Sequence, residues 1–179
     1  MSEKGTLYFF TGLAGAGKTT IGSLFYERLS HRKNNVIFRD GDQIRAEELA
    51  ISIENGVPLA RDYSLEDRLR GARATCPWCQ KVTDQGSDIV FCTISMFDEI
   101  RDWYRKNLDN YKEIYVKVSL ETLYRRDQKN LYNSDVKNVV GKDLPYEEPK
   151  TPDIIIENEG QETPEEIVDR IERAFFGNL

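Results

Sequence analysis

The 179-residue sequence contains only three cysteines and one histidine, and it has no long apolar run. Three cysteines are too few for a disulfide scaffold and fit a reducing compartment. A closed zinc site usually takes four cysteine or histidine ligands, so a structural zinc ion is disfavoured. No apolar stretch approaches the roughly 18 residues that span a bilayer, and residues 7–10 are fewer than the apolar region of a signal peptide. We therefore expect a cytoplasmic protein with no membrane partner.

Basic residues are outnumbered, because 25 Lys and Arg stand against 31 Asp and Glu and give a formal net charge of −6. A nucleic-acid polymer requires a basic surface that replaces phosphate counterions, so we expect no such partner. Any anionic small molecule must then be bound by local positive groups. The length suits one compact domain and would be cramped for two, so we expect a single domain over residues 1–179.

Short apolar runs alternate with longer segments of helical period, which predicts an α/β fold with five parallel strands and helices on both faces. Residues 130–152 include three prolines and little periodicity, which is typical of a lid or binding loop. The expected strands cover residues 7–10, 36–38, 89–92, 114–118 and 154–156. The expected helices cover residues 18–30, 65–85, 97–107, 120–127 and 164–176.

The strongest motif is G-L-A-G-A-G-K-T at residues 12–19, which matches the phosphate-binding pattern G-x-x-x-x-G-K-[ST] between an expected strand and an expected helix. Glycines let the backbone N–H groups point at phosphate oxygens, with the positive end of the helix behind them. Lys18 is then expected to bridge the β and γ phosphates of ATP, and the Thr19 hydroxyl to hold Mg²⁺. The predicted ATP-binding residues of this loop are Gly12, Ala14, Gly15, Ala16, Gly17, Lys18, Thr19 and Thr20.

A second group of polar residues, Asp40, Asp42 and Arg45, follows the second expected strand. Open α/β sheets bind ligands at the carboxyl ends of their strands. One carboxylate can accept the proton of an attacking hydroxyl while the other orders Mg²⁺, although Asp and Gly are also common in turns and helix caps. We predict Asp42 as the general base and Asp40, with Thr19, as the metal site. The predicted catalytic residues are Asp42, Lys18 and Asp40.

Together these motifs resemble the adenylyl-sulfate kinases, P-loop enzymes that phosphorylate the ribose 3′-hydroxyl of adenylyl sulfate with ATP and Mg²⁺. The likeness covers nearly the whole chain. It includes Asp40-Gly41-Asp42 with Arg45, Tyr63-Ser64 with Asp67-Arg68, Ile94-Ser95, the run R-D-Q-K-N-L-Y at residues 126–132 and the run P-Y-E-E-P at residues 145–149.

The resemblance implies that Arg45 and Arg68 hold the phosphate group of a nucleotide acceptor and that Tyr63 stacks on its base. Guanidinium groups match phosphate oxygens, and an aromatic face supports a planar base. It also implies a lid at about residues 129–149 and a homodimer. Arg125 and Arg126 precede the lid and are expected to contact ATP as it closes, with a solvated helix face as the alternative, above all for Arg125. The acceptor-binding residues expected on this basis are Asp42, Arg45, Tyr63, Arg68, Ile94, Ser95, Lys129 and Val139.

Two departures from the family pattern concern the acceptor. The lid reads V-V-G-K-D at residues 139–143 where the family usually has F-T-G-I-D, so one aromatic ring is lost. Asp98 stands where the family has arginine, and a carboxylate beside an anion site is expected to alter recognition. The pattern is similar to one branch, the cytidine diphosphoramidate kinases of bacterial capsule biosynthesis, because a smaller pyrimidine needs less aromatic surface. We therefore expect a kinase for cytidine 5′-diphosphoramidate, with adenylyl sulfate as the alternative acceptor.

Three other functions stay open on the sequence alone: another small-metabolite kinase, a non-catalytic nucleotide-binding module, and a thiol-disulfide protein. The last rests on Cys76-Pro77-Trp78-Cys79, which has the spacing of a redox pair. Such a pair normally opens a helix directly after a strand, whereas this one lies inside an expected helix. Buried, unreactive thiols are the favoured interpretation.

Overall fold

β1 (Leu7–Thr11) is the middle strand of a five-stranded sheet in which every neighbouring pair is parallel, in the order β2-β3-β1-β4-β5. Leu7 lies opposite Ile89 of β3 and Tyr111 of β4. The computed structural model describes residues 3–55, 63–127 and 130–177. The predicted five-stranded parallel sheet is thus confirmed. Its other strands are β2 (Val36–Asp40), β3 (Asp88–Thr93), β4 (Tyr111–Lys117) and β5 (Ile154–Glu157).

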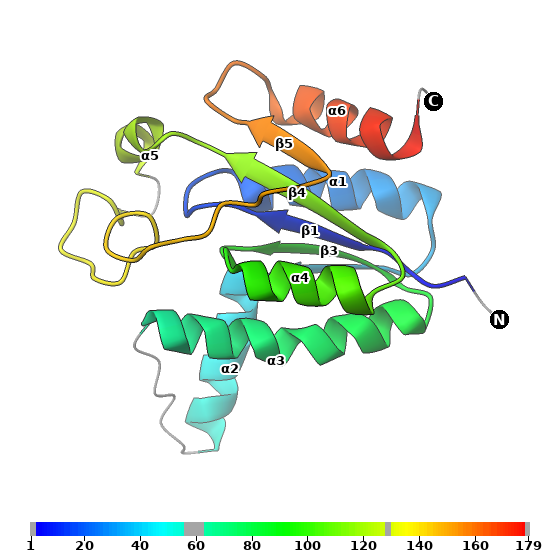
Figure 1. Ribbon diagram of the computed structural model, residues 1–179, viewed down its shortest axis with the longest axis horizontal. Helices are drawn as coiled ribbons and strands as arrows, with labels where there is room; N and C mark the ends of the chain where they lie inside the picture. The colour runs from blue at the N-terminus through cyan, green and yellow to red at the C-terminus, as the bar shows by residue number, and fades with distance from the viewer. Residues whose placement is uncertain (1–2, 56–62, 128–129, 178–179) are drawn as a thin grey trace.

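Helices cover both faces of the sheet, which explains why β1 is buried along its whole length (Figure 1). Tyr8 and Phe10 point toward α1 and α6 and join one core, while Leu7 and Phe9 join a second core under α3 and α4. Successive residues of a strand face opposite sides, so one short strand contributes to both cores. The helices are α1 (Lys18–Arg32), α2 (Gly41–Glu54), α3 (Leu65–Asp84), α4 (Asp98–Asn107), α5 (Leu120–Arg126) and α6 (Pro164–Phe176).

The C-terminal helix α6 begins where the sequence pattern predicts it. The Thr163 hydroxyl accepts from the Glu166 N–H at 3.2 Å, and the Glu166 carboxylate accepts from the Thr163 N–H at 2.8 Å. This reciprocal capping box satisfies two helix-end donors, and Pro164 fits the first turn because its missing N–H is not needed there. Among the described residues, no helix combines the length and apolar character that crossing a membrane requires.

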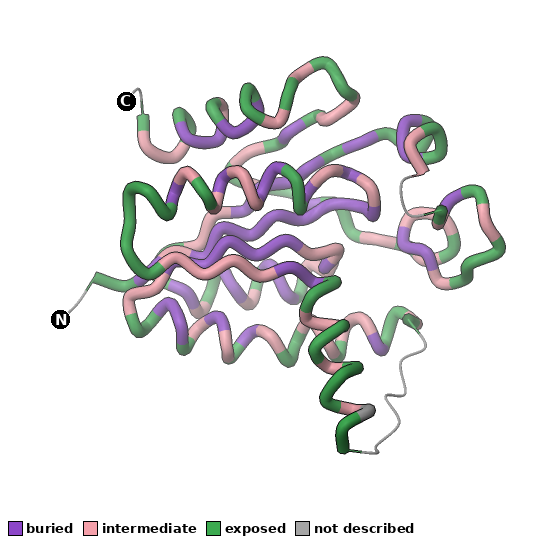
Figure 2. Tube along the Cα trace, turned by 180° about the vertical axis from the view of Figure 1, so that it is seen from behind, coloured by how far each residue is buried: buried purple, intermediate pink, exposed green. Residues whose placement is uncertain are grey.

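Helix α2 is the element that the sequence analysis missed. It follows β2 without a break and projects away from the sheet, with most of its surface exposed (Figures 1 and 2). Leu49 is 50% exposed and Ile51 is 57% exposed. The helix therefore lacks the buried apolar stripe that normally reveals a helix in a sequence. The Asp-Gly-Asp sequence at its start was interpreted as a catalytic and metal site, with a turn or helix cap as the alternative, and Asp42 is favourable in the first turn of a helix.

The predicted irregular segment is also present. From residue 130 to residue 153 the structure has no helix or strand, only a single bridge between Val140 and Leu144. The segment lies beyond the carboxyl ends of the strands, next to α5 (Figure 1). Its start is organised by Asp127, whose carboxylate accepts from the backbone N–H groups of Leu131, Tyr132 and Asn133. These hydrogen bonds, that from Tyr132 foremost, lower the pKa of the Asp127 carboxyl.

Candidate active site

The loop of residues 12–17 connects β1 to α1 through three glycines with positive φ, 149° at Gly12, 76° at Gly15 and 96° at Gly17. Side chains with a Cβ rarely adopt this region. At Gly12 a Cβ would also lie 2.3 Å from the Val116 carbonyl oxygen, so the loop passes too close to β4 for any larger residue. Gly17 is the N-cap of α1 and has no side chain with which to cap it. The first amide groups of α1 therefore need an acceptor from outside the helix, and a phosphate group fits that need.

Lys18 lies inside this loop, with only 7% of its surface exposed. Its Nζ donates to the Leu13 carbonyl oxygen at 2.8 Å, which holds the ammonium group across the loop. A buried ammonium group is costly unless it is paired and hydrogen-bonded. An arriving phosphate would supply the compensating negative charge.

The end of β2 is tied to the start of α1 through a carboxylate. Asp40 is buried, and its two oxygens accept from the Thr19 hydroxyl at 2.6 Å and from the Asp42 N–H at 2.7 Å. Mg²⁺ takes oxygen ligands, commonly one or two from the protein and the rest from water and phosphates. The hydroxyl and carboxylate oxygens present here fit that preference.

Asp42 lies in the first turn of α2 and its side chain is half-exposed. Its carboxylate forms an ion pair with Arg45, three residues further along the helix. Residues three apart lie on the same face of a helix, so this spacing presents both groups to the same region. Arg45 in turn reaches a cavity, which we call the arginine cavity.

The arginine cavity opens between α2, α3 and the segment after β3. It brings together five of the eight residues that the resemblance predicts for the acceptor, namely Arg45, Tyr63, Arg68, Ile94 and Ser95. Ser95 is nine-tenths buried. Within the part of the chain that the structure describes, its hydroxyl has no hydrogen-bond partner. A ligand or an ordered water in the cavity would supply the missing bond.

Arg68 of α3 contacts Tyr63, which precedes its own helix, and Asn138 of the irregular segment. Its guanidinium donates to the carbonyl oxygens of Tyr63 and Asn138, both at 3.0 Å, and lies 5.6 Å from the centre of the Tyr63 ring. Burial and the nearby charge of Arg45 lower the pKa of Arg68. Two arginines that repel each other at the mouth of one cavity would both be stabilised by an anion between them.

Three of the predicted acceptor residues are not in this lining. Val139 is buried in the core on the α1 side, and its neighbour Val140 lines the cavity instead. Asp42 lies outside the lining, next to Gly41 and Arg45, which are part of it. Lys129 lies outside the described residues. Other lining residues were not predicted from the sequence, among them Glu48, Asp67, Thr93 and Met96. Of these four, only Asp67 could have been predicted, because it precedes Arg68 in a family motif.

A second cavity, which we call the loop cavity, lies against the first turn of α1. Gly15, Gly17 and Thr20 line it together with Arg126 and Asn158. Asn158 was not predicted; its side-chain N–H donates to the Ala16 carbonyl oxygen at 2.9 Å and fixes the β5 end against the loop. Arg125 is not part of this lining. Its guanidinium instead donates to the Thr122 hydroxyl at 3.1 Å on its own helix.

The irregular segment also rests on the phosphate-binding loop. The buried Tyr132 hydroxyl donates to the Ala14 carbonyl oxygen at 2.9 Å. A Cβ at Gly141 would lie 3.0 Å from the Leu13 side chain, so the segment passes close to the loop there. The segment therefore lies between the two cavities, where a lid would act.

Asp98 has a different environment from the one that the sequence analysis expected. It lies outside the arginine cavity and pairs with the buried Arg101 and with Lys150, whose Nζ is 2.6 Å away. The hydrogen bond from Lys150, together with Arg101, lowers the pKa of the Asp98 carboxyl. The charge of this carboxylate is thus compensated by two cations, and its effect on acceptor recognition stays a prediction.

The cysteines lie in the core. Cys76 and Cys79 are buried among Phe9, Phe91 and Tyr104 on the α3 side. Burial raises the pKa of Cys79 to about 12 and also raises that of Cys76. Redox-active cysteines are exposed and have lowered pKa values, so neither property of a redox pair is present.

The thiols should therefore react slowly with a disulfide reagent at pH 8. We expect less than one thiol per chain to be modified within minutes in the folded protein, and all three after unfolding in guanidinium, because only unfolding exposes them and lowers their pKa values. The absorbance of the thiolate that the reagent releases measures the number of modified cysteines. Rapid modification of two thiols in the folded chain would restore the thiol-disulfide interpretation.

A phosphate-binding loop after the central strand of a parallel sheet, beside a cavity for a second substrate, defines the P-loop kinase class. Within that class, the adenylylsulphate kinase family model matches residues 4–157, and the chain belongs to this family. It is accordingly a phosphotransferase that uses a hydroxyl group as acceptor.

Two of its relatives carry different names. Cytidine diphosphoramidate kinase from Campylobacter jejuni is 38% identical over 175 residues, which cover 96% of each chain. Adenylyl-sulfate kinase from Clostridium kluyveri is 34% identical over 161 residues, which cover 87% of this chain and 76% of the relative. Among solved structures, the Mycobacterium tuberculosis APS kinase CysC in complex with AMPPNP and APS has a TM-score of 0.78 at 24% identity, covering 96% of this chain and 97% of the other, and shows the same fold.

Proposed function

We propose that this chain transfers the γ-phosphate of ATP to the ribose 3′-hydroxyl of cytidine 5′-diphosphoramidate. The observation that carries the proposal is the similarity to the Campylobacter jejuni cytidine diphosphoramidate kinase, which extends over 96% of both chains at 38% identity. Capsule phosphoramidate synthesis is the pathway that this acceptor implies.

The arginine cavity suits such an acceptor. Tyr63 offers an aromatic face for the base, and the lid contributes the aliphatic Val140 to the lining. Val139, which stands at the position of the family's aromatic ring, is buried in the core instead. Arg45 and Arg68 lie where the acceptor's negatively charged phosphate groups would sit. Of the described lid residues, those that line the cavity are Val140 and Pro145, neither of which is aromatic, and this favours a base that needs less stacking surface.

The donor site is the phosphate-binding loop with the loop cavity. The loop amides and Lys18 bind the β and γ phosphates, and Arg126 lies where ATP extends past Gly15 and Thr20. Thr19 and Asp40 would hold Mg²⁺, which when bound adds positive charge beside the transferred phosphate. Residues 129–149 form the proposed lid, which excludes water from the reacting groups.

Asp42 is the proposed general base for the 3′-hydroxyl. In the structure its carboxylate pairs with Arg45, which also lines the arginine cavity. An acceptor phosphate entering the cavity competes with Asp42 for this guanidinium. Acceptor binding therefore leaves the carboxylate better able to take the proton as the hydroxyl attacks phosphorus in line, and no covalent enzyme intermediate is needed.

Initial rates with the two candidate acceptors test the proposal. With ATP and Mg²⁺ held constant, kcat/KM for cytidine 5′-diphosphoramidate should exceed that for adenylyl sulfate by at least about tenfold. The adenine base would lack the second aromatic contact that the family's lid usually provides, and the lost stacking weakens its binding. Efficient turnover of adenylyl sulfate with no turnover of the cytidine compound would assign the chain to adenylyl-sulfate phosphorylation instead.

Tyr63 separates a nucleotide acceptor from a sugar or sugar acid. Replacing Tyr63 with alanine should raise the acceptor KM about tenfold, because base–aromatic stacking contributes about 1–3 kcal/mol. Tyr63→Phe keeps the ring and should stay within about twofold of the wild type. An unchanged acceptor KM in Tyr63→Ala would favour another small-metabolite kinase.

Assembly as a homodimer is a further prediction from the family resemblance, and a cytoplasmic location is a prediction from the composition of the sequence. Sedimentation equilibrium measures the first: a mass of twice 20.7 kDa is the expected result.

A further inference from the structure

The acceptor turn, residues 94–97, connects β3 to α4 and contributes its four residues to the lining of the arginine cavity. Residues 94–97 lie outside any helix or strand, although the Phe97 carbonyl oxygen accepts from the N–H groups of Ile100 and Arg101 in α4. The Ser95 carbonyl oxygen accepts from the Thr11 hydroxyl at 3.3 Å, which holds the turn on the β1 side. On the other side the turn runs into α4, whose N-cap is Phe97. Phenylalanine has no side-chain acceptor, so another residue must satisfy the first amide groups of this helix.

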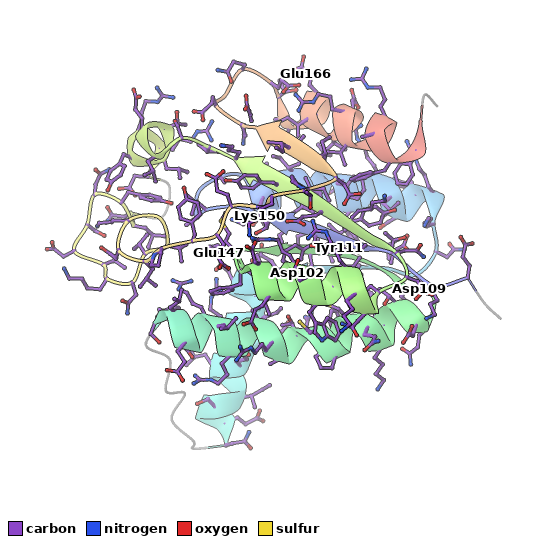
Figure 3. The ribbon with its side chains drawn as sticks, in the orientation of Figure 1. Asp102, Asp109, Tyr111, Glu147, Lys150 and Glu166 are labelled. Atoms are coloured by element: carbon purple, nitrogen blue, oxygen red, sulfur yellow. The ribbon has the colours of Figure 1, made fainter. Side chains whose placement is uncertain are left out.

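Glu147 provides that acceptor from a distant part of the chain. Its carboxylate accepts from the Asp98 N–H at 2.6 Å, at the first residue of α4. Its own N–H donates to the Met96 carbonyl oxygen at 3.1 Å. Glu147 thus bonds the acceptor turn on one side and the helix start on the other. Figure 3 shows its side chain near the start of α4.

The backbone of Glu147 is itself anchored. Arg101, which is 1% exposed, donates to the Glu147 carbonyl oxygen at 2.8 Å. The same guanidinium contacts Asp98 and lies 3.5 Å from the wholly buried Glu113 of β4. Buried charge pairs of this kind are fixed in geometry because moving one partner leaves an uncompensated charge. The backbone of Glu147 is therefore held by a rigid cluster of buried charges, while its side chain reaches the N-terminal end of α4.

We propose that Glu147 is a positioning residue that sets the acceptor turn by capping α4 from the C-terminal end of the lid. The carboxylate neutralises the positive end of α4, and the backbone bond to Met96 fixes the turn beside it. Ser95 and Met96 are then presented to the acceptor in one arrangement. The proposal rests on the proposed function only in that the cavity binds the phosphate acceptor, and it assigns a task to the P-Y-E-E-P motif.

Adjacent glutamates provide a matched experiment. Glu147→Ala removes the cap, whereas Glu147→Gln keeps an oxygen that can accept from the Asp98 N–H. Glu148→Ala removes a neighbouring exposed carboxylate that pairs with Lys117 at 3.2 Å. Glu147→Ala should raise the acceptor KM about fivefold, because acceptor binding must then order a turn that has lost its cap, and leave the ATP KM within about twofold. Glu147→Gln and Glu148→Ala should both stay near the wild type.

Amide hydrogen exchange gives a readout that does not depend on turnover. In Glu147→Ala the amides of residues 96–101 should exchange at least about fivefold faster than in the wild type, while those of β1 stay unchanged. An unchanged exchange rate in this segment, or an equal effect of Glu148→Ala on acceptor KM, would overturn the positioning role. If the wild type phosphorylates neither candidate acceptor, the proposed function fails, and the exchange experiment still decides the role of Glu147.

Discussion

Replacing Lys18 with alanine should reduce kcat/KM by about 10²- to 10³-fold, the usual effect of removing one preorganised donor to a reacting group. Lys18 is buried within the phosphate-binding loop and its Nζ is held by the Leu13 carbonyl oxygen, so its charge is already in place before ATP binds. Preorganised charge of this kind stabilises the transferring phosphate without the cost of reorganising solvent. Steady-state rates over a range of ATP concentrations measure the loss.

The matched control is Lys112→Ala, which removes an exposed lysine that pairs with Asp153 at 3.2 Å on β4. This variant should retain full activity, because exposed ion pairs contribute little. Thermal unfolding of Lys18→Ala distinguishes a catalytic loss from a collapsed loop, since the variant also loses the bond to Leu13. A folded Lys18→Ala protein with wild-type turnover would contradict phosphate binding by this loop.

Asp42→Asn should lower kcat by about 10²- to 10³-fold while leaving the ATP KM nearly unchanged. The amide keeps the size of the side chain but cannot accept the proton of the acceptor hydroxyl. The carboxylate is half-exposed and paired with Arg45, so neither folding nor ATP binding depends on it. The rate of ADP formation with saturating acceptor measures the effect.

Asp40→Asn is the informative companion variant. Its carboxylate holds the Thr19 hydroxyl and the Asp42 N–H, so the expected result is a higher Mg²⁺ concentration for half-maximal rate. A kcat loss in Asp42→Asn that added Mg²⁺ restores would show that the two carboxylates have the opposite roles.

The parts of the fold that could be predicted share one property, a strong local pattern. β1 is buried along its whole length, and the glycine-rich loop that follows it matches a phosphate-binding pattern, so residues 7–19 predicted both this strand and the loop. The capping box before α6 is equally local. Patterns of this kind specify structure within a few residues.

Local sequence patterns did not predict the features that depend on contacts between distant parts of the chain. Helix α2 exposes apolar residues and starts on an Asp-Gly-Asp sequence, so periodicity did not reveal it. Asp98 is compensated by Lys150, 52 residues away, and the α4 cap comes from Glu147. Which of Val139 and Val140 reaches the cavity depends on how the lid packs on Leu13, which no local pattern records.

The chemical structure of the reaction product tests most directly whether phosphate is transferred from ATP in the loop cavity to the acceptor in the arginine cavity. After incubation of the protein with ATP, Mg²⁺ and cytidine 5′-diphosphoramidate, phosphorus NMR should show a new phosphomonoester coupled to the ribose H3′ proton, with an equal amount of ADP. Conversion of ATP to ADP and inorganic phosphate with the nucleotide unchanged, or no consumption of ATP, would contradict the account.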